Sequence, residues 1–331
     1  MSIILSYVLP CYNVERYITD CLNSIYAQDL PEDEFEVICV NDCSTDGTCR
    51  IIEEWQIIHP NLHLIHHSKN MHVGIARNTG VNQAVGGYVC FVDADDYLPK
   101  NVMKKLVLDA IDDSLDVLLF NDVIDYKGEI LQERIVYANS IVMSGDDYVE
   151  NCLNGNISKL GSPWAKLFNR SFLLKHSIWY SDLIYSEDAA FVWEVMICAK
   201  KVKSVSDIGY VYRANDMSFS ANIKKPYVLY TSSVLYPNVL LAMLNRYGND
   251  VPCVIQKGVQ NEIKTEIGGF FKKYLSYGEE GRREIYSLIR EKASPIRRLS
   301  NYMNRKQKIA FKMRKMGFGV FDAVVKKMFI N

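Results

Sequence analysis

The sequence predicts an α/β fold in which a mostly parallel sheet is flanked by helices, with a helical extension toward the C-terminus. Short apolar, β-branched runs alternate with segments of helical periodicity over about the first 120 residues. Strands separated by helices of this length form parallel sheets that are covered on both faces. Beyond Lys225 strand signals become rare and the periodicity is helical. We therefore expect an α/β domain over residues 1–222 and a helical region over residues 223–331.

The expected elements follow one another in a regular order. Each strand is an apolar run that stops at a turn residue or a polar cluster, and each helix carries apolar residues three or four apart. In the first half the expected strands are residues 3–9, 35–40, 62–66, 88–92 and 117–120, and the expected helices are residues 14–26, 51–58, 75–84 and a segment after Pro99. The second half is less regular, and there we expect strands at residues 129–136 and 205–213 and helices at residues 146–154 and 189–199.

The composition is that of a folded protein with a large core. Hydrophobic residues make up 49% of the chain and charged residues 23%, a balance that excludes wholesale disorder. No uninterrupted apolar run approaches the roughly 20 residues of a membrane-spanning helix, and the first residues lack the pattern of a secretory signal, so we expect a cytoplasmic protein. Nine cysteines, several inside apolar runs, indicate reduced core residues. The group Cys39, Cys43 and Cys49 lacks the paired spacing of a zinc site.

The charge is unevenly distributed, although the formal net charge is only −1. Residues 282–331 contain fourteen Lys or Arg and three Asp or Glu, a net charge of +11, which leaves −12 for the rest of the chain. Basic amphipathic helices bind anionic membranes, so we expect residues 290–331 to contact the inner face of the cell membrane. The alternatives are a helix packed on its own domain and a contact between subunits. Nucleic-acid binding has no supporting signature.

The strongest chemical signal is the acidic cluster Asp93, Asp95 and Asp96, which follows the fourth expected strand. Side chains two apart in an extended chain point to the same side, so Asp93 and Asp95 can project into one site. Carboxylates this close repel one another unless a cation neutralises them, and hard oxygen ligands suit Mn²⁺ or Mg²⁺. Because open α/β sheets bind ligands at the carboxyl ends of their strands, a metal-bound diphosphate is the expected ligand.

Three other interpretations of this cluster stay open at this point. The acids could form a solvated turn or a cap for the helix that begins near Pro99. A phosphotransferase of the haloacid dehalogenase kind also places an aspartate at a strand end, but its pattern needs a Thr or Val shortly after the second acid, where this chain reads DYL. A nucleotidylyltransferase would carry a glycine-rich stretch after the first strand, where this chain reads PCYN.

Several segments, taken in chain order, carry the clearest indication of function. They read SYVLPCYNVERYITDCLNSI, VICVNDCSTDGT, HVGIARNTGVNQAVGGYVCFVDADDYL, GSPWAKLFNRSFL, YSEDAAF and VYRANDMSFS. Together they resemble glycosyltransferase family 2, the inverting enzymes with a GT-A fold, of the kind that builds bacterial capsule, O-antigen and exopolysaccharide. The likeness reaches about Ser220, and Cys43 departs from it because the family usually has glycine there. It implies a nucleotide-binding half over residues 1–100 and an acceptor half over residues 101–222.

For the donor nucleotide, the resemblance implies a pocket at the ends of the first two strands. Asp42 would hydrogen-bond the base, Arg77 would lie beside it, and the backbone near Pro10 and Tyr12 would complete the pocket. The alternatives are that Asp42, with Asp46, only caps the next helix, and that Arg77 is a surface helix residue.

For the diphosphate, the resemblance implies a metal held by the D-x-D aspartates. Asp93 would hold the ribose or a metal-bound water, Asp95 would bind the metal, and Asp96 would share the metal or support its ligands. Arg213 could add a contact to the phosphates, or it could pair with Asp207 or Asp216 instead.

For the transfer step, the acceptor hydroxyl needs a base. The resemblance implies Asp188 as that base, with Glu187 as a positioning acid, although both could simply favour the positive end of the helix that they begin. Lys166 could contact the phosphates or lie as a solvated helix charge, and Trp164 could stack on the acceptor sugar or lie in the core.

The expected reaction therefore moves a hexose or N-acetylhexosamine from a nucleotide diphosphate sugar, with UDP as the expected nucleotide, to a saccharide or lipid-linked saccharide. The alternative is an inactive scaffold subunit of a polysaccharide assembly complex. The simultaneous presence of Asp42, Asp93, Asp95 and Asp188 favours activity. The sequence leaves the oligomeric state open.

Overall fold

The computed structural model describes residues 2–134, 140–155, 162–214 and 225–330, which form two compact units. The first unit comprises Met1–Asp182 and Phe191–Asp216, and the second comprises Leu183–Ala190 and Met217–Asn331. The expected boundary at residue 222 lies outside the described residues. Residues 183–190, which we expected in the α/β domain, group with the second unit.

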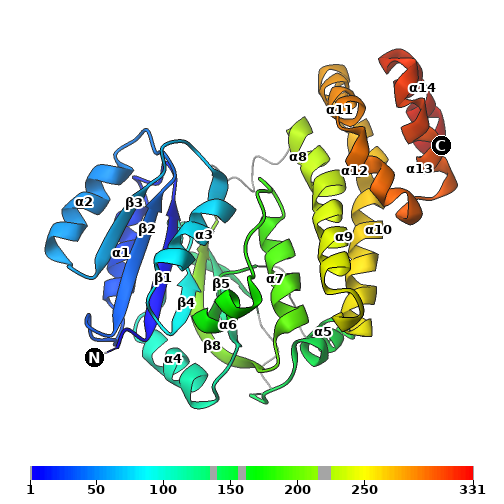
Figure 1. The fold of residues 1–331 in the computed structure, drawn as a ribbon. Helices are drawn as coiled ribbons and strands as arrows, with labels where there is room; N and C mark the ends of the chain where they lie inside the picture. The colour runs from blue at the N-terminus through cyan, green and yellow to red at the C-terminus, as the bar shows by residue number, and fades with distance from the viewer. Residues whose placement is uncertain (1, 135–139, 156–161, 215–224, 331) are drawn as a thin grey trace. The chain divides into compact units, whose positions relative to one another are not determined.

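The first unit is built on one sheet, drawn in Figure 1, whose strands run in the order β3-β2-β1-β4-β7-β5-β6 with β8 also paired to β5. The strands are β1 (Leu5–Cys11), β2 (Phe35–Asn41), β3 (Leu62–His66), β4 (Tyr88–Phe91), β5 (Val117–Tyr126), β6 (Glu129–Arg134), β7 (Lys166–Asn169) and β8 (Val202–Arg213). The β1–β2, β2–β3, β1–β4 and β5–β8 pairs are parallel, whereas β7 and β6 pair antiparallel with their neighbours. The predicted mixed, mostly parallel sheet is therefore confirmed.

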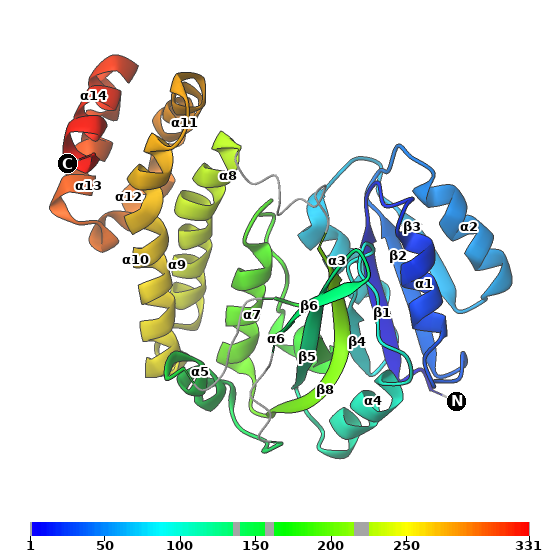
Figure 2. The same cartoon turned by 180° about the vertical axis from the view of Figure 1, so that it is seen from behind.

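The helices of this unit cover the sheet on both faces. They are α1 (Ile18–Tyr26), α2 (Thr48–Ile58), α3 (His72–Gln83), α4 (Met103–Asp112), α5 (Gly145–Leu153), α6 (Arg170–His176) and α7 (Glu187–Cys198), whose first turn belongs to the second unit. The chain moves from β1 outward to β3 and then returns to β4 on the other side of β1. Because crossovers between parallel strands are right-handed, this reversal places α1 and α2 on one face and α3 on the other, as Figures 1 and 2 show.

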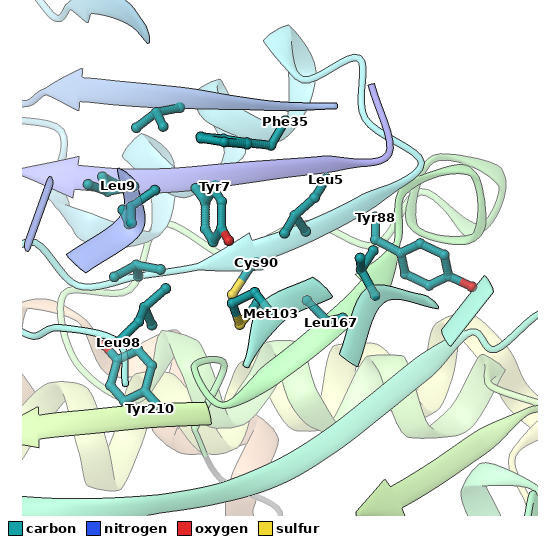
Figure 3. Close-up of a cluster of buried hydrophobic side chains, with 14 of the residues drawn as sticks. Leu5, Tyr7, Leu9, Phe35, Tyr88, Cys90, Leu98, Met103, Leu167 and Tyr210 are labelled. Carbon is teal, nitrogen blue, oxygen red and sulfur yellow. The ribbon is translucent and has the colours of Figure 1, made fainter. Parts of the chain in front are cut away.

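The core of the first unit lies against the central strands. Leu5, Tyr7 and Leu9 of β1 are fully buried and, two apart in the sequence, lie on the same side of the strand, in the cluster that Figure 3 shows with Cys90 of β4. On the opposite face α3 approaches β1 closely. A Cβ atom at Gly80 would lie 2.2 Å from Cγ1 of Val8, so this contact requires glycine.

Two short elements were not predicted. β7 and α6 occupy Lys166–Asn169 and Arg170–His176, within a stretch that we had not assigned. A buried strand of this length has too few residues for periodicity to identify it. β7 obtains its position from tertiary pairing, because it lies between β4 and β5 and is antiparallel to both.

The second unit is helical, as predicted. Its helices are α8 (Pro226–Tyr230), the π-helical turn η2 (Thr231–Leu235), α9 (Tyr236–Tyr247), η3 (Gly248–Asp250), α10 (Cys253–Leu275), α11 (Glu279–Glu291), α12 (Ala293–Arg298), η4 (Leu299–Tyr302), α13 (Arg305–Met313), η5 (Arg314–Met316) and α14 (Phe318–Phe329). The π-helical turn precedes Pro237, which lacks an N–H and clashes with the carbonyl of the preceding turn.

One helical run of the second unit, Pro226–Asp250, is long and apolar enough to cross a membrane by length and composition alone. Our sequence criterion had not singled it out. Of its apolar window 67% is buried inside the protein, as in the core helix of a folded domain.

Part of the apolar side of the basic C-terminal segment, residues 290–331, is also buried. Phe271 of α10 contacts Phe311 of α13, with ring centroids 4.8 Å apart, and Tyr274 of α10 contacts the ring of Phe321 of α14 at 5.6 Å. These aromatic contacts fit the alternative of a segment packed on its own unit, but Met316, Val320 and Ile330 stay exposed, so contact with a membrane stays a prediction.

Candidate functional site

The carboxyl ends of β1, β2 and β4 meet at one edge of the sheet. In the parallel register Cys11 lies opposite Asn41, and Val8 lies opposite Phe91. The chain reverses its direction of travel between β1 and β4, and such a switch point is where open α/β sheets bind ligands. Pro10 lies within β1, and Tyr12 follows that strand with 49% of its surface exposed.

Asp42 follows β2 directly and is held by protein donors on one side. Its Oδ1 lies 2.7 Å from Nδ1 of His67 and accepts a hydrogen bond of 2.8 Å from the backbone N of Met71. The other ring nitrogen of His67 lies 2.9 Å from Oγ1 of Thr79 on α3. The carboxylate is only 3% exposed, and Oδ2 has no protein donor within the described part of the chain. Asp42 therefore does not cap the next helix.

The turn after Asp42 explains the usual glycine at position 43. Cys43 adopts a φ of 65°, in the left-handed region where a side chain costs about 1 kcal/mol. The turn nevertheless keeps its form, because Ser44 N donates to Oδ1 of Asn41 at 3.0 Å and Thr45 N donates to Oδ1 of Asn13 at 2.8 Å.

Asp93 and Arg77 form an ion pair at the same edge. The Arg77 Nη2 donates to Oδ1 of Asp93 at 2.7 Å, and the guanidinium lies 5.3 Å from the ring centroid of Tyr180. Arg77 comes from α3 and is only 4% exposed, so it is not a surface helix residue. Its ion pair is with Asp93, whereas we had expected it beside Asp42.

Asp96 is turned inward. Both of its oxygens accept hydrogen bonds from the protein, 2.6 Å from the Tyr210 hydroxyl and 2.8 Å from the backbone N of Arg213. The same Tyr210 hydroxyl accepts the backbone N–H of Asp93 at 3.1 Å, which links the two aspartates. Burial raises the pKa of Asp96, and the charges of Asp95 and Asp93 raise it further.

The three aspartates do not form a common ligand set. Among the residues that the structure describes, no group of three His, Cys, Asp or Glu side chains is arranged to hold a metal ion. Asp96 accepts a hydrogen bond from Tyr210 and is buried, so it is not placed to share a metal ion as we had expected. The remaining expected metal ligands are Asp93 and Asp95, which are partly exposed.

Arg213 ends β8 and reaches across to α1. Its Nη1 donates to Oδ2 of Asp20 at 3.2 Å, and its guanidinium lies 5.3 Å from the ring centroid of Tyr17 and 5.2 Å from that of Tyr97. The expected alternative partner Asp207 pairs with Lys105 instead, and Asp216 lies outside the described residues.

Trp164 and Lys166 both pack into the sheet region. The Trp164 ring stacks 5.1 Å from the ring centroid of Tyr210 and 5.9 Å from that of Tyr212, against the core. Lys166 lies in β7, is 4% exposed, and its ammonium donates to the carbonyl of Ser162. The alternative of a solvated helix charge for Lys166 is therefore wrong.

Glu187 and Asp188 occupy the first turn of α7, in the second unit. Glu187 is 7% exposed, and Oδ1 of Asp188 accepts the backbone N–H of Ala189 at 2.8 Å, as expected of an acid that begins a helix. Burial raises the pKa of the neighbouring Tyr185, and the charges of Asp188, Glu266 and Glu187 add to that effect. Tyr185 therefore lies close to both acids of this turn and to Glu266.

Comparison with known proteins identifies the family. A model described as glycosyl transferase family 2 matches residues 6–173, about half of the chain. The chain belongs to this family. Poly(ribitol-phosphate) beta-N-acetylglucosaminyltransferase TarS of Staphylococcus aureus is 34% identical over 209 residues, which are 62% of this chain and 35% of TarS. Poly(ribitol-phosphate) beta-glucosyltransferase of Bacillus spizizenii is 30% identical over 210 residues, 63% of this chain and 32% of that protein. The chain thus spans about a third of the length of these relatives.

Solved structures give the same fold for this family 2 chain. The crystal structure of S. aureus TarS 1–349 in complex with UDP-GlcNAc aligns with a TM-score of 0.65 and 22% identity, over 98% of this chain and 91% of that one. The mannosyltransferase PcManGT from Pyrobaculum calidifontis, in complex with GDP-Man and Mn²⁺, aligns with a TM-score of 0.53 and 16% identity, over 100% and 88%. The fold is therefore GT-A.

Three residues around the family 2 motifs escaped the sequence analysis: His67, Tyr180 and Tyr210. His67 follows β3 directly, so its place at the same strand edge as Asp42 was a usable signal. Tyr210 and Tyr212 are two apart in one strand and therefore share a face, a pattern visible in GYVYR. Tyr180 had no local signal, because its contact with Arg77 depends on tertiary packing.

Proposed function

We propose that this chain is an inverting glycosyltransferase that moves a hexose or N-acetylhexosamine from a UDP-sugar to a hydroxyl of a glycan or lipid-linked saccharide in cell-surface polysaccharide synthesis. The observation that carries the proposal is the grouping of Asp42 and the Arg77–Asp93 ion pair at the switch point of the sheet. The UDP-GlcNAc complex of TarS supports a uridine donor. The relatives transfer different sugars by name, so the proposal leaves the sugar open.

In this proposal the donor base binds beside Asp42. The protein donors at Oδ1 leave Oδ2 to accept an N–H of the base, and His67 fixes the plane of the carboxylate. The backbone near Pro10 and the ring of Tyr12 line the same strand end. Arg77 acts through Asp93, which it orients toward the ribose.

Asp95 and Asp93 are the residues that would hold Mn²⁺ or Mg²⁺. Their donor set fits such a cation, because both are partly exposed carboxylates two positions apart, and hard oxygen ligands suit Mn²⁺ and Mg²⁺. A bound divalent cation would neutralise the charge of the departing diphosphate. Asp96, held by Tyr210 and the backbone of Arg213, would fix the turn that presents Asp93 and Asp95.

The transfer step needs a base for the acceptor hydroxyl. We assign Asp188 to that role and Glu187 to positioning, since both are carboxylates in the first turn of α7 and an ionised carboxylate can accept a proton. Arg213 would add a phosphate contact from the end of β8, where its charge is shared between Asp20 and two tyrosine rings. Trp164 and Lys166 would contact the acceptor only at the edge of the site, because Trp164 stacks on Tyr210 and the ammonium of Lys166 donates to the carbonyl of Ser162.

The test is metal-dependent release of UDP from a panel of UDP-sugars, comparing wild type, Asp95→Ala and the exposed control Asp33→Ala. Loss of a charge-stabilising group in an active site costs roughly 100- to 1,000-fold in rate, so Asp95→Ala should lose at least that much while Asp33→Ala keeps wild-type activity. If folded wild-type protein released no UDP from any donor, the proposed enzymatic activity would be contradicted, and the inactive scaffold subunit would remain as the alternative. Release of phosphate from a phosphoester instead would favour the phosphotransferase.

A further inference from the structure

The second unit contains a cavity of about 700 Å³ that is lined by arginine and lysine residues. It is lined by Arg290 of α11, Arg297 of α12, Lys312 of α13, and Arg314 and Lys315 of η5. Five cations from four elements, α11, α12, α13 and η5, therefore line one cavity. None of them belongs to the donor edge of the sheet or to the acids of α7.

Arg314 is the cavity residue whose position is fixed by the surrounding protein. It is only 8% exposed, its Nη1 donates to the carbonyl of Phe311, and its own carbonyl accepts the Tyr286 hydroxyl at 3.0 Å. The guanidinium is thus fixed in place while it lines the cavity. Burial lowers the pKa of Arg314, and the charge of Arg297 lowers it further. The two arginines repel each other, and an anion between them would relieve that repulsion.

Among the described residues, no carboxylate forms an ion pair with these cations. Residues 282–331 contain three acids, Glu284, Glu291 and Asp322. Asp322 is used elsewhere, because it pairs with Arg282 and with Lys326, each at 2.8 Å. Within the described ranges, no ion pair joins any acid to the five residues of the cavity.

We propose that this basic cavity binds a phosphate or phosphodiester group. The planar guanidinium of arginine can donate two hydrogen bonds to the oxygens of one phosphate. The fixed Arg314 offers one such group, beside the exposed Arg297 and Lys312. Two sources offer this chemistry, the headgroup of an anionic lipid and a phosphate-bearing soluble glycan. This proposal does not depend on the proposed transferase activity, because none of the cavity residues belongs to the site at the edge of the sheet.

The experiment measures binding of three probes to full-length protein. The probes are vesicles of phosphatidylcholine with phosphatidylglycerol, vesicles of phosphatidylcholine alone, and free glycerophosphoglycerol, the same phosphodiester without acyl chains. The test variant is Arg297→Gln/Lys312→Gln, whose side chains are exposed. The matched control is Arg298→Gln/Lys308→Gln, two exposed basic residues of α12 and α13 outside the cavity. Arg314→Gln, checked for native circular dichroism, is the second test.

The test variant should bind the phosphodiester probe about tenfold more weakly than wild type, whereas the control should lose far less. Binding of free glycerophosphoglycerol would identify a soluble phosphodiester as sufficient, and binding of the anionic vesicles alone would identify a lipid headgroup. Equal loss in the test and control variants would overturn the proposal, since charge alone would then explain binding. So would the absence of binding to either phosphodiester probe.

Discussion

The two units of the protein differ in how their charged groups are satisfied. At the sheet edge of the first unit Asp42, Asp93 and Asp96 all accept hydrogen bonds from protein donors. In the second unit the five cations of the basic cavity have no protein carboxylate within the described residues. Charged groups that pair within the protein hold a site in one geometry, whereas cations that form no ion pair with a protein carboxylate can bind an anionic ligand. The comparison predicts that substitutions in the first set cost stability and that substitutions of the exposed members of the second set, such as Arg297, do not.

The largest effect is expected from Arg77→Met. The change removes a buried cation and leaves Asp93 without its ion pair, so the free energy of unfolding should fall by about 3 kcal/mol. Urea unfolding measures it. Lys105→Met is the matched control, because Lys105 pairs with Asp109 and Asp207 on the surface and should cost less than about 1 kcal/mol. An equal loss of unfolding free energy in the two variants would show that the buried Arg77–Asp93 pair stabilises the protein no more than a surface ion pair does.

Asp322→Asn tests an acid of the basic segment that forms ion pairs, with Arg282 and with Lys326. Although burial alone would raise the pKa of Asp322, hydrogen bonds from Lys326, Tyr274 and Arg282 outweigh it and lower that pKa. A lowered pKa contributes stability above the unfolded value of about 3.9, and this stability is lost as pH falls through the folded value. The variant should therefore cost about 2 kcal/mol at pH 7 and progressively less below about pH 4.

The control for that pH profile is Asp250→Asn, an exposed acid of the same unit. It should change neither the unfolding free energy nor its pH dependence. A cost for Asp322→Asn that stays constant from pH 7 to pH 3 would mean that the carboxylate charge is not what stabilises the unit.

A smaller effect is expected from Tyr210→Phe. The change removes the hydroxyl that donates to Asp96 and accepts from the backbone of Asp93, so it should cost about 1–2 kcal/mol in unfolding free energy. The comparison variant is Tyr126→Phe, whose hydroxyl has no hydrogen bond within the described part of the chain. If the hydroxyl positions the turn, donor turnover should fall in Tyr210→Phe and not in Tyr126→Phe.

The smallest effect is expected from Arg297→Gln. This residue is exposed and repels Arg314, so its removal should change the unfolding free energy by no more than about 0.5 kcal/mol, with the sign toward stabilisation. Thermal and urea unfolding both measure it. A cost above about 1 kcal/mol would show that Arg297 has a structural partner, and the contrast between the two units would then disappear.

The fold was largely predictable because its central strands β1, β2 and β4 are buried on both faces. β1, β2 and β4 read as continuous apolar runs that end at polar residues, which fixed the sheet edge and the positions of Asp42 and Asp93. β7 was missed because its four residues obtain their place from pairing with β4 and β5 rather than from a local pattern.

The contacts of the site were less predictable than its residues. The distinction between Asp95 and Asp96 depends on Tyr210, which is 114 positions away in sequence. The Arg77–Asp93 pair likewise depends on how α3 lies on the sheet. The basic segment was recognised by composition, but composition could not show that its apolar residues pack on Phe271 and Tyr274 of α10.

The central claim is that the edge of the sheet at Asp42 binds a uridine diphosphate sugar. Calorimetric titration of UDP into wild type, Asp42→Asn and the exposed control Asp33→Asn, with Mn²⁺ and then with a chelator, tests it most directly. We expect wild type and the control to bind, binding to weaken when Mn²⁺ is removed, and Asp42→Asn to bind at least about tenfold more weakly, because a base N–H loses its charged acceptor. Folded wild-type protein that binds no UDP, or an Asp42→Asn variant that binds as wild type does, would contradict the claim.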